Sequence, residues 1–275
     1  MTGLPKSIVF AGLALFAILI FVPLKAVGSE SEFDCGTIAC DEFEADFDNK
    51  ASLQNGAKWF DNYCAGCHSL KYSRYERVAD DLDIPHELMV KNLVPWDLEK
   101  NEDGKIGQLM SISMAPADAK NWLGAAPPDL TLVSRLRSPE WLYTYLRNFY
   151  QDDSRPAGVN NRVFDKVAMP HVMLELQGLK ECAPSPLLDS HGKPVRGENG
   201  EEEMAHCGTL ATVTEGRMST EEFDTAIYDL VNYLDYVAEP GASARKHAGV
   251  YVLLFLGVFL VFALLLDREY WRELH

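Results

Sequence analysis

The segment Cys64-Ala65-Gly66-Cys67-His68 constrains the fold of this chain more than any other part of it. Its spacing, Cys-x-x-Cys-His, is typical of sites where a haem is attached covalently to protein. At such a site the two thiols add to the two vinyl groups of the porphyrin, and an imidazole nitrogen of the histidine binds the iron. The segment therefore predicts one covalent haem c held by Cys64, Cys67 and His68.

Two other interpretations of this segment are a simple disulfide and half of a zinc site. A zinc site needs a second pair of Cys or His ligands at suitable spacing. The remaining four of the six cysteines do not offer such a pair. The haem interpretation is therefore the stronger one.

The 275-residue chain is strongly acidic, with 41 Asp and Glu residues against 25 Lys and Arg residues and a formal net charge of −16. A protein that binds nucleic acid would present a basic face, so the composition argues against nucleic acid as a partner. It favours a positively charged partner that is attracted over a long range.

The N-terminal residues have the layout of a secretory signal peptide. Lys6 precedes an apolar run over residues 8–22, and the small residues Ala26-Val27-Gly28 follow that run. This order predicts a signal peptide over residues 1–28. The apolar run is short for a membrane-spanning helix, and an uncleaved anchor is the alternative.

A second apolar run, residues 248–266, contains no charged residue and is long enough to cross the hydrocarbon core of a membrane. Arg245-Lys246 precedes it, and Tyr270-Trp271, which suits the membrane interface, follows it. We expect a transmembrane helix over residues 245–267. A buried core helix is the alternative.

The orientation of this helix follows from the haem segment, because the charges on its two sides are nearly balanced. Haem of the c type is attached on the outer side of the bacterial inner membrane. Residues 29–244 are therefore the expected periplasmic haem domain, and residues 268–275 are a short cytoplasmic tail.

Three segments between the two apolar ends have the apolar period of helices. One begins near Ala51 and runs up to Cys64. A second begins at Ser138-Pro139-Glu140, where the serine suits the N-cap and the proline the first turn. In the third, Ser219 and Glu222 form a capping box, and the apolar period ends at Pro240-Gly241.

No sustained alternation of apolar and polar residues predicts a sheet. Segments 97–128, 151–167 and 183–217 are expected to be long loops, which are unusual in a compact domain unless they wrap a large cofactor. The sequence thus predicts a mainly α fold. We expect a haem domain like that of class I c-type cytochromes, with long loops, followed by one C-terminal transmembrane helix.

A haem that carries electrons needs a second axial ligand, and Met169 is the leading candidate. It lies in a short apolar stretch, and Pro170 prevents that stretch from continuing as a regular helix. Ligation by Met and His gives a comparatively high reduction potential. Residue type alone leaves His171, Met110 and Met114 as rivals, and a methionine that only packs in the core as the simplest alternative.

Several landmarks together resemble the cytochrome c1 family, the haem-bearing subunits of ubiquinol–cytochrome c reductase (the cytochrome bc1 complex). The haem segment continues as Ser69-Leu70, Ala125-Ala126-Pro127-Pro128-Asp129-Leu130 is similar to the family's proline-rich segment, and Ala168-Met169-Pro170-His171-Val172 resembles its bacterial ligand loop. The single C-terminal membrane helix occurs in the family's order as well.

The resemblance implies His68 and Met169 as axial ligands and places Pro128 beside the haem. It also implies a basic residue near a haem propionate, for which Arg162 is the nearest match and Arg155 a rival. The implied function is to take one electron from the Rieske iron–sulfur protein and to pass it to a soluble, basic cytochrome c. Cytochrome b is the implied partner subunit, and the bacterial inner membrane is the implied location.

Two other classes of function compete with this one. A haem c subunit of another membrane oxidase or dehydrogenase would use the same chemistry. A peroxidase or gas sensor would need an open or displaceable sixth position on the iron, so the state of Met169 distinguishes it. A purely structural membrane anchor would carry no redox-active haem.

An exported protein favours paired cysteines. The resemblance to bacterial family members favours a disulfide between Cys182 and Cys207, while Cys35 and Cys40 either form a small ring or stay free. Acidic residues gather over residues 41–48 and 198–203. Such runs are usually solvated faces, and the family suggests a rim that attracts a basic cytochrome.

Overall fold

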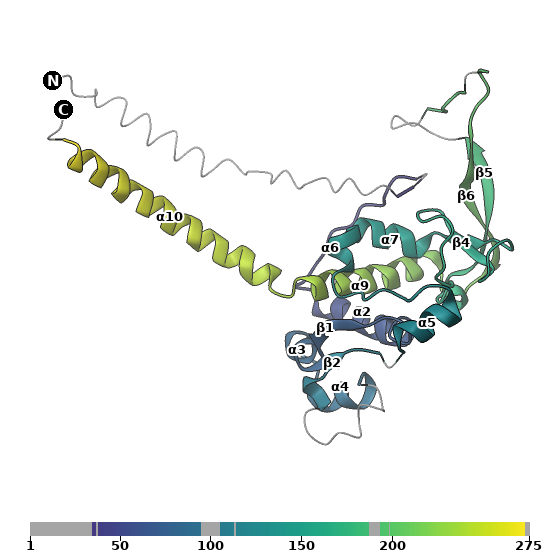
Figure 1. Cartoon of the computed structure of the whole chain (residues 1–275), viewed down its shortest axis with the longest axis horizontal. Coiled ribbons are helices and arrows are strands. Elements are labelled where there is room, and N and C mark those ends of the chain that lie inside the picture. Colours follow the sequence, from purple (N-terminus) through teal and green to yellow (C-terminus); the bar gives the residue numbers. More distant parts are fainter. Residues whose placement is uncertain are drawn as a thin grey trace. The chain divides into compact units, whose positions relative to one another are not determined.

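The computed structural model describes residues 35–272, except 37, 95–104, 113, 187–192 and 198. The expected signal peptide over 1–28 and the last three residues of the expected cytoplasmic tail lie outside the described residues. The helices are α2 (Lys50–Tyr63), α3 (Tyr75–Asp81), α4 (His86–Asn92), η2 (Lys105–Gly107), α5 (Pro116–Leu123), α6 (Val133–Arg137), α7 (Pro139–Arg147), α8 (Leu174–Gln177), α9 (Thr220–Ala238) and α10 (Ala242–Tyr270). The strands are β1 (Leu70–Arg74), β2 (Leu109–Met110), β3 (Phe149–Gln151), β4 (Val159–Asn161), β5 (Gly178–Pro186) and β6 (Met204–Glu215) (Figure 1).

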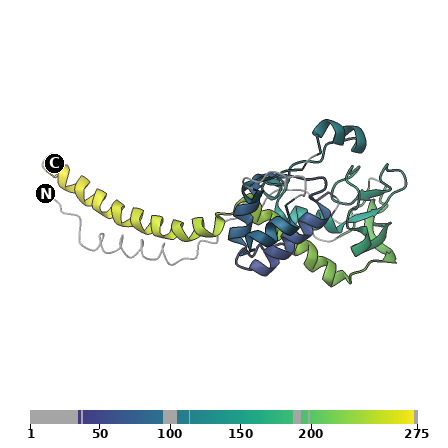
Figure 2. The ribbon, with the colours of Figure 1, turned by 90° about the horizontal axis from the view of Figure 1, so that it is seen from below.

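The centre of the core is the packing of α2 against α9, which lie side by side in Figures 1 and 2. Gly56 permits the close approach, because a Cβ atom there would lie 2.1 Å from the Asp229 carbonyl oxygen and 2.5 Å from Tyr233 Cβ. The Ser52 hydroxyl donates to Asp229 Oδ1 at 2.6 Å across the same interface. The apolar side chains buried around this contact include Leu53, Ala57, Phe60, Phe223, Ile227, Leu230 and Leu234.

The helix ends expected from local sequence are present. The Trp141 amide donates to the Ser138 side chain at the start of α7, with Pro139 in the first turn. Ser219 and Glu222 form both hydrogen bonds of the capping box of α9. That helix ends at Ala238, two residues before Pro240. The mainly α class is confirmed.

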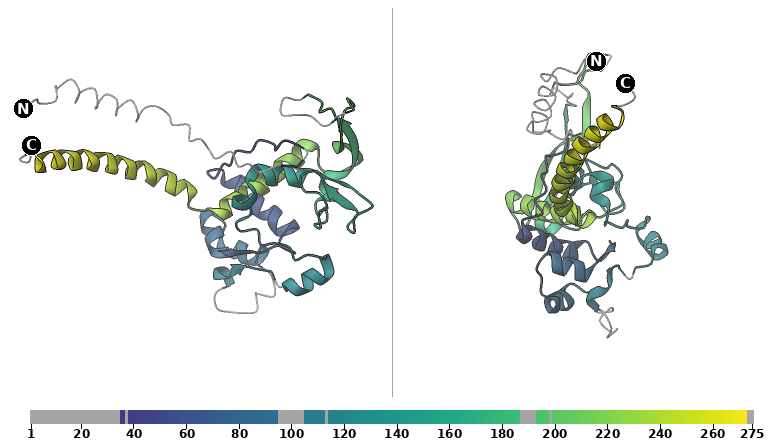
Figure 3. Two further views of the ribbon diagram at one scale, coloured as in Figure 1. Left: turned by 45° about the horizontal axis from the view of Figure 1, so that its top comes forward. Right: turned by 90° about the vertical axis from the view of Figure 1, so that its left-hand side faces the viewer.

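The expectation of no sheet is wrong. Three two-stranded antiparallel sheets pair β1 with β2, β3 with β4 and β5 with β6, and the long β5–β6 hairpin (Figure 3) occupies much of the expected loop 183–217. Its register shifts between Leu179 and Lys180 and again between Ala183 and Ser185. Each shift interrupts the two-residue alternation by which a strand is recognised, which explains why the sequence did not predict the hairpin.

Helix α10 is the one described helix that is long and apolar enough to cross a membrane. Its 29 residues span about 44 Å at 1.5 Å per residue, more than the roughly 30 Å of a hydrocarbon core. Ala242 is its buried residue, and the large apolar side chains from Val250 onward are exposed. Such a surface is stable in lipid, which favours a membrane span over a buried core helix.

Candidate haem site

The Cys-x-x-Cys-His segment forms a compact turn at the C-terminal end of α2. Cys64 is the C-cap of that helix, and the amides of Cys67 and His68 donate to the Cys64 carbonyl at 3.0 and 2.8 Å. Both thiols are unbridged. Burial, and to a smaller degree the neighbouring Cys67, raises the pKa of the Cys64 thiol to about 12. The two thiols lie one turn apart, directly before the histidine.

The imidazole of His68 is held by the proline-rich segment. Its Nδ1 lies 2.7 Å from the Pro128 carbonyl oxygen. A carbonyl only accepts, so Nδ1 carries the proton and Nε2 keeps its lone pair. Burial lowers the pKa of His68, which also favours the neutral ring. This is the tautomer in which a metal-binding histidine is oriented by a backbone carbonyl.

Two backbone amides hold the segment Pro128-Asp129-Leu130 against residues 69–71, which directly follow His68. The Leu130 amide donates to the Ser69 carbonyl at 2.9 Å, and the Lys71 amide donates to Asp129 Oδ2 at 2.8 Å. The sequence placed Pro128 beside the haem, and in the structure its carbonyl oxygen contacts the expected proximal ligand.

Met169 is half-buried against the core, and its thioether faces helix α7. The Tyr145 hydroxyl donates to Met169 Sδ at 3.5 Å. On the chain before it, Arg155 Nη2 donates to the Lys166 carbonyl at 2.9 Å, and Lys166 has a left-handed backbone with φ of 58°. The loop that carries Met169 is therefore held from two sides.

The rival axial ligands have different surroundings. The His171 ring lies flat on Phe149, with 4.9 Å between the ring centroids, and burial lowers its pKa to about 4. The Tyr233 hydroxyl contacts Met110 Sδ at 3.9 Å. Met114 is half-buried. None of these side chains lies in a short loop ended by a proline directly after it, as Met169 does.

The two arginines considered for the haem propionate have different surroundings. Arg162 donates from Nε to the Cys207 carbonyl at 3.2 Å, from Nη1 to Asn148 Oδ1 at 3.0 Å and from Nη2 to the Gly208 carbonyl. All three of its nitrogens thus bind protein acceptors, two of them on the β5–β6 hairpin. Arg155 Nε is buried without a hydrogen-bond partner among the described residues.

Arg137, at the end of α6, was missed by the sequence analysis. Its guanidinium lies 5.3 Å from the Trp141 ring centroid and 5.9 Å from that of Phe164. Trp141 stacks on Tyr145, whose hydroxyl contacts Met169. The described contacts of Arg137 include no hydrogen bond or ion pair. In the sequence only Trp141 and Tyr145, four residues apart on the expected helix, signal this arrangement, because Ser138 separates Arg137 from that helix.

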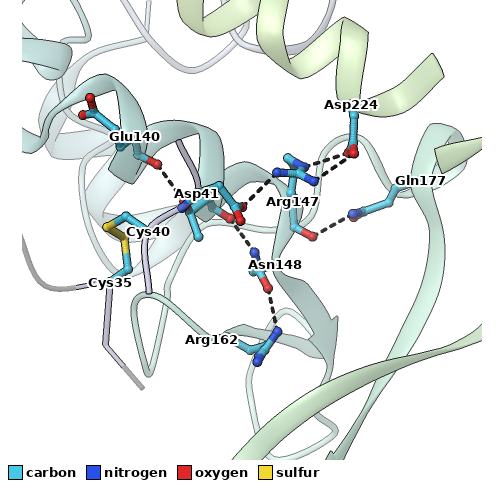
Figure 4. Close-up of polar contacts among 10 residues, drawn as sticks. Cys35, Cys40, Asp41, Glu140, Arg147, Asn148, Arg162, Gln177 and Asp224 are labelled. Atoms are coloured by element: carbon cyan, nitrogen blue, oxygen red, sulfur yellow. Dashed lines mark hydrogen bonds and ion pairs between the residues drawn. A yellow bond between two sulfur atoms is a disulfide. The ribbon is translucent and has the colours of Figure 1, made fainter. Parts of the chain in front are cut away.

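Away from these residues, Arg147 connects three parts of the chain (Figure 4). It donates to both carboxylate oxygens of Asp224 on α9, at 2.7 and 2.8 Å, and to Asp41 at 2.8 Å. The Asp41 amide donates to Thr144 Oγ1. Asp41 directly follows the disulfide between Cys35 and Cys40. This network fixes the acidic segment 41–48, which the sequence analysis interpreted as a solvated face, to the helices.

A second disulfide joins Cys182 to Cys207 across the hairpin. Four cysteines are therefore paired, and the two of the haem segment are free. In the described part of the chain no group of three His, Cys, Asp or Glu side chains is arranged to hold a metal ion. The donor set of two free thiols, an imidazole with an available Nε2 and a thioether fits haem c and does not fit zinc.

Comparison with known proteins agrees with this geometry. The sequence profile of the Cytochrome C1 family matches residues 40–274. Cytochrome c1 of Allochromatium vinosum is 43% identical over 96% of this chain and 98% of its own length. The ammonia monooxygenase gamma subunit of Nitrosomonas europaea is 38% identical over 95% of this chain and 97% of its own. Cytochrome c1 of Rhodospirillum rubrum is 27% identical over 82% of each chain. The chain belongs to the cytochrome c1 family.

Proposed function

We propose that this protein is a membrane-anchored electron carrier and the haem c subunit of a ubiquinol–cytochrome c reductase. The observation that carries the proposal is the bond between His68 Nδ1 and the Pro128 carbonyl, which leaves Nε2 available beside two free thiols. Membership of the cytochrome c1 family supports it. The cofactor is one haem c, attached through Cys64 and Cys67.

The bound haem supplies reversible one-electron chemistry between ferric and ferrous iron. In this proposal His68 and Met169 would both bind the iron. Pro128 keeps the imidazole in the binding tautomer, and the buried surroundings of Cys64 and Tyr145 exclude water. A saturated coordination shell of this kind transfers electrons and leaves no site for a small molecule.

The haem propionate is paired with Arg137 rather than Arg162 in this proposal. Arg162 has its nitrogens committed to Asn148 and the hairpin. The guanidinium of Arg137 is held by two aromatic rings beside the Met169 contact. Because the described contacts of Arg137 include no hydrogen bond, its guanidinium has all of its donors available for a propionate. Arg155 is not assigned to the propionate, because it donates to the backbone of the loop that carries Met169.

Membership of the family supports the partners and the location that we propose. The chain would receive electrons from the Rieske iron–sulfur protein, pass them to a soluble basic cytochrome c and assemble with cytochrome b. Residues 1–28 would be the signal peptide, 29–244 a periplasmic domain, 245–267 the span and 268–275 the tail. The described helix begins earlier, at Ala242. The net charge of −16 suits a basic acceptor.

A second candidate is a haem c subunit of another membrane oxidase or dehydrogenase. The name of the Nitrosomonas europaea relative, a subunit of ammonia monooxygenase, supports a role in a different oxidoreductase. Both candidates share the haem chemistry and differ in the proteins around it. The co-purifying subunits and the electron donor therefore distinguish them.

The test uses the full chain tagged at its C-terminus and solubilised gently from membranes. We expect a quinol to reduce a six-coordinate haem c promptly and haem b to co-purify. A haem c that ignores quinol and purifies with other subunits would favour the second candidate. A haem that readily binds carbon monoxide would show an open iron and contradict the role of Met169.

A further inference from the structure

The hydroxyl of Tyr145 donates a hydrogen bond to the sulfur of Met169, with 3.5 Å between the oxygen and Sδ. A thioether is a weak acceptor, and it has two lone pairs. One of them remains for the hydroxyl when the other binds iron. Among the described residues no other acceptor takes this hydroxyl, although Tyr145 is only 8% exposed.

Two aromatic neighbours hold the phenol ring in place. It stacks on Trp141 with 4.8 Å between centroids and 11° between planes, and Phe149 meets it edge-on at 5.2 Å. The Tyr145 carbonyl accepts from Asn161 Nδ2 at 2.8 Å, which joins α7 to β4 at the beginning of the segment leading to Met169. The Tyr145 hydroxyl and the segment that carries Met169 are therefore both connected to α7.

We propose that Tyr145 is a positioning residue that raises the reduction potential of the haem by donating a hydrogen bond to the Met169 thioether. This inference rests on the proposed function, in which Met169 is an axial ligand. The hydrogen bond withdraws electron density from the sulfur, so the sulfur donates less to the iron. Ferric iron depends on that donation more than ferrous iron does, so the ferrous form is favoured. Hydrogen bonds around axial ligands are a recognised means by which proteins tune haem potentials.

The test is a visible redox titration of haem c in the complex purified with the Tyr145→Phe chain. Phenylalanine keeps the ring stack and removes only the hydroxyl. A net hydrogen bond of ordinary strength predicts a roughly twofold to tenfold fall in the ferrous-to-ferric ratio at a fixed ambient potential. Tenfold corresponds to a potential lower by about 59 mV for a one-electron couple. The weak red charge-transfer band from sulfur to ferric iron should persist.

Replacing Tyr145 by 3-fluorotyrosine gives a second variant with the opposite expectation. Its hydroxyl is more acidic and donates more strongly, so the potential should rise. An unchanged potential in both variants, or loss of the charge-transfer band in Tyr145→Phe, would overturn the inference. The matched control is Tyr233→Phe, which removes the hydroxyl that contacts Met110 Sδ at 3.9 Å and should leave the potential unchanged. A shift in Tyr233→Phe alone would also overturn it.

Met169→Leu separates this inference from the proposed function. If that variant loses the charge-transfer band while Tyr145→Phe keeps the parent potential, Met169 is the ligand and only the hydrogen-bond role fails. If Met169→Leu leaves the band unchanged, the ligand assignment fails, and the inference about Tyr145 fails with it.

Discussion

Single hydrogen bonds and ion pairs in this protein hold particular neighbouring groups in place. Pro128 supplies a carbonyl that decides which nitrogen of His68 is free. Arg147 brings together Asp41, Asp224 and, through its own carbonyl, the Gln177 side chain at 2.8 Å (Figure 4). At the residue scale the consequences of single substitutions can therefore be argued from single contacts.

The ion pair of Arg147 with Asp224 is expected to contribute measurably to stability. Its side chains are 22% and 29% exposed, and the geometry is bidentate. Exposed pairs contribute about 0–1 kcal/mol and breaking buried ones costs about 3–5 kcal/mol, so Asp224→Asn should lower the free energy of unfolding by about 1–3 kcal/mol. Denaturant unfolding of the purified protein measures this. Asp83→Asn, which breaks the exposed pair with Lys50, is the control and should change little; equal losses would contradict the prediction.

Asp61 on α2 should make stability depend on pH. Burial raises the pKa of its carboxyl to about 6 in the folded protein, above the value of about 4 expected in the unfolded chain. Between these two pH values the folded state binds more protons, so the contribution of Asp61 is largest below pH 4 and is lost as pH rises through 6. Because the carboxyl is partly exposed, solvent screening reduces the effect to about 1 kcal/mol.

Asp61→Asn removes this titration. We expect the variant to be more stable than the parent at pH 7 and to differ less from it at pH 4. Unfolding measured at both pH values gives the difference between the two proteins, in which the other titrating groups cancel. A stability difference that stays constant with pH would refute the account.

Among the elements, the α2–α9 contact is the one most sensitive to side-chain volume. A methyl group on Gly56 would overlap the Asp229 carbonyl and Tyr233, and the two helices would have to separate. Overpacking of this kind costs about 1–3 kcal/mol, so Gly56→Ala should unfold at a lower temperature in a thermal melt. Gly241→Ala is the matched control, since a Cβ there meets nothing within 4 Å. A parent-like melt for Gly56→Ala would show that the helices adjust without cost.

The elements also show what could be predicted from the sequence. The starts of α7 and α9 were predictable because Ser138 and Ser219 bind amides only three residues away. The β5–β6 hairpin was not, because its two register shifts depend on a partner strand distant in sequence. Arg162 was favoured, with Arg155 as its rival, because the resemblance to the family implies a basic residue near a haem propionate. Only the fold shows that Arg162 binds the β5–β6 hairpin. It also shows that Arg137 lies on Trp141, which stacks on Tyr145 beside Met169.

The whole molecule is an acidic domain joined to an apolar helix through a charged junction. Glu239, the C-cap of α9, accepts from Arg135 on α6 and from Arg245 on α10, both at 2.7 Å. One carboxylate thus connects α6 and α9 to α10, which begins directly after Pro240-Gly241. The two arginines also neutralise it, so the pKa of Glu239 is lowered, chiefly by its hydrogen bond from Arg245.

The net charge of −16 predicts how the molecule meets its acceptor. Electron transfer from the reduced complex to a basic cytochrome c should slow by roughly tenfold or more as salt is raised from low to physiological levels, because screening weakens steering. Stopped-flow kinetics over a salt series measures this. An acidic cytochrome is the control and should show the opposite trend. A rate to the basic cytochrome that does not change with salt would exclude electrostatic steering.

The division of the six cysteines into two disulfides and two free thiols determines how this protein must mature. Short loops close most readily, so in an oxidising compartment the nearest pairs react first: Cys35 with Cys40, and Cys64 with Cys67. The first reaction completes the native ring, while the second consumes the two sulfurs that the porphyrin needs. If haem c is attached here, as we propose, its attachment competes with disulfide formation between Cys64 and Cys67, and a reductant that keeps these two thiols free would favour the haem.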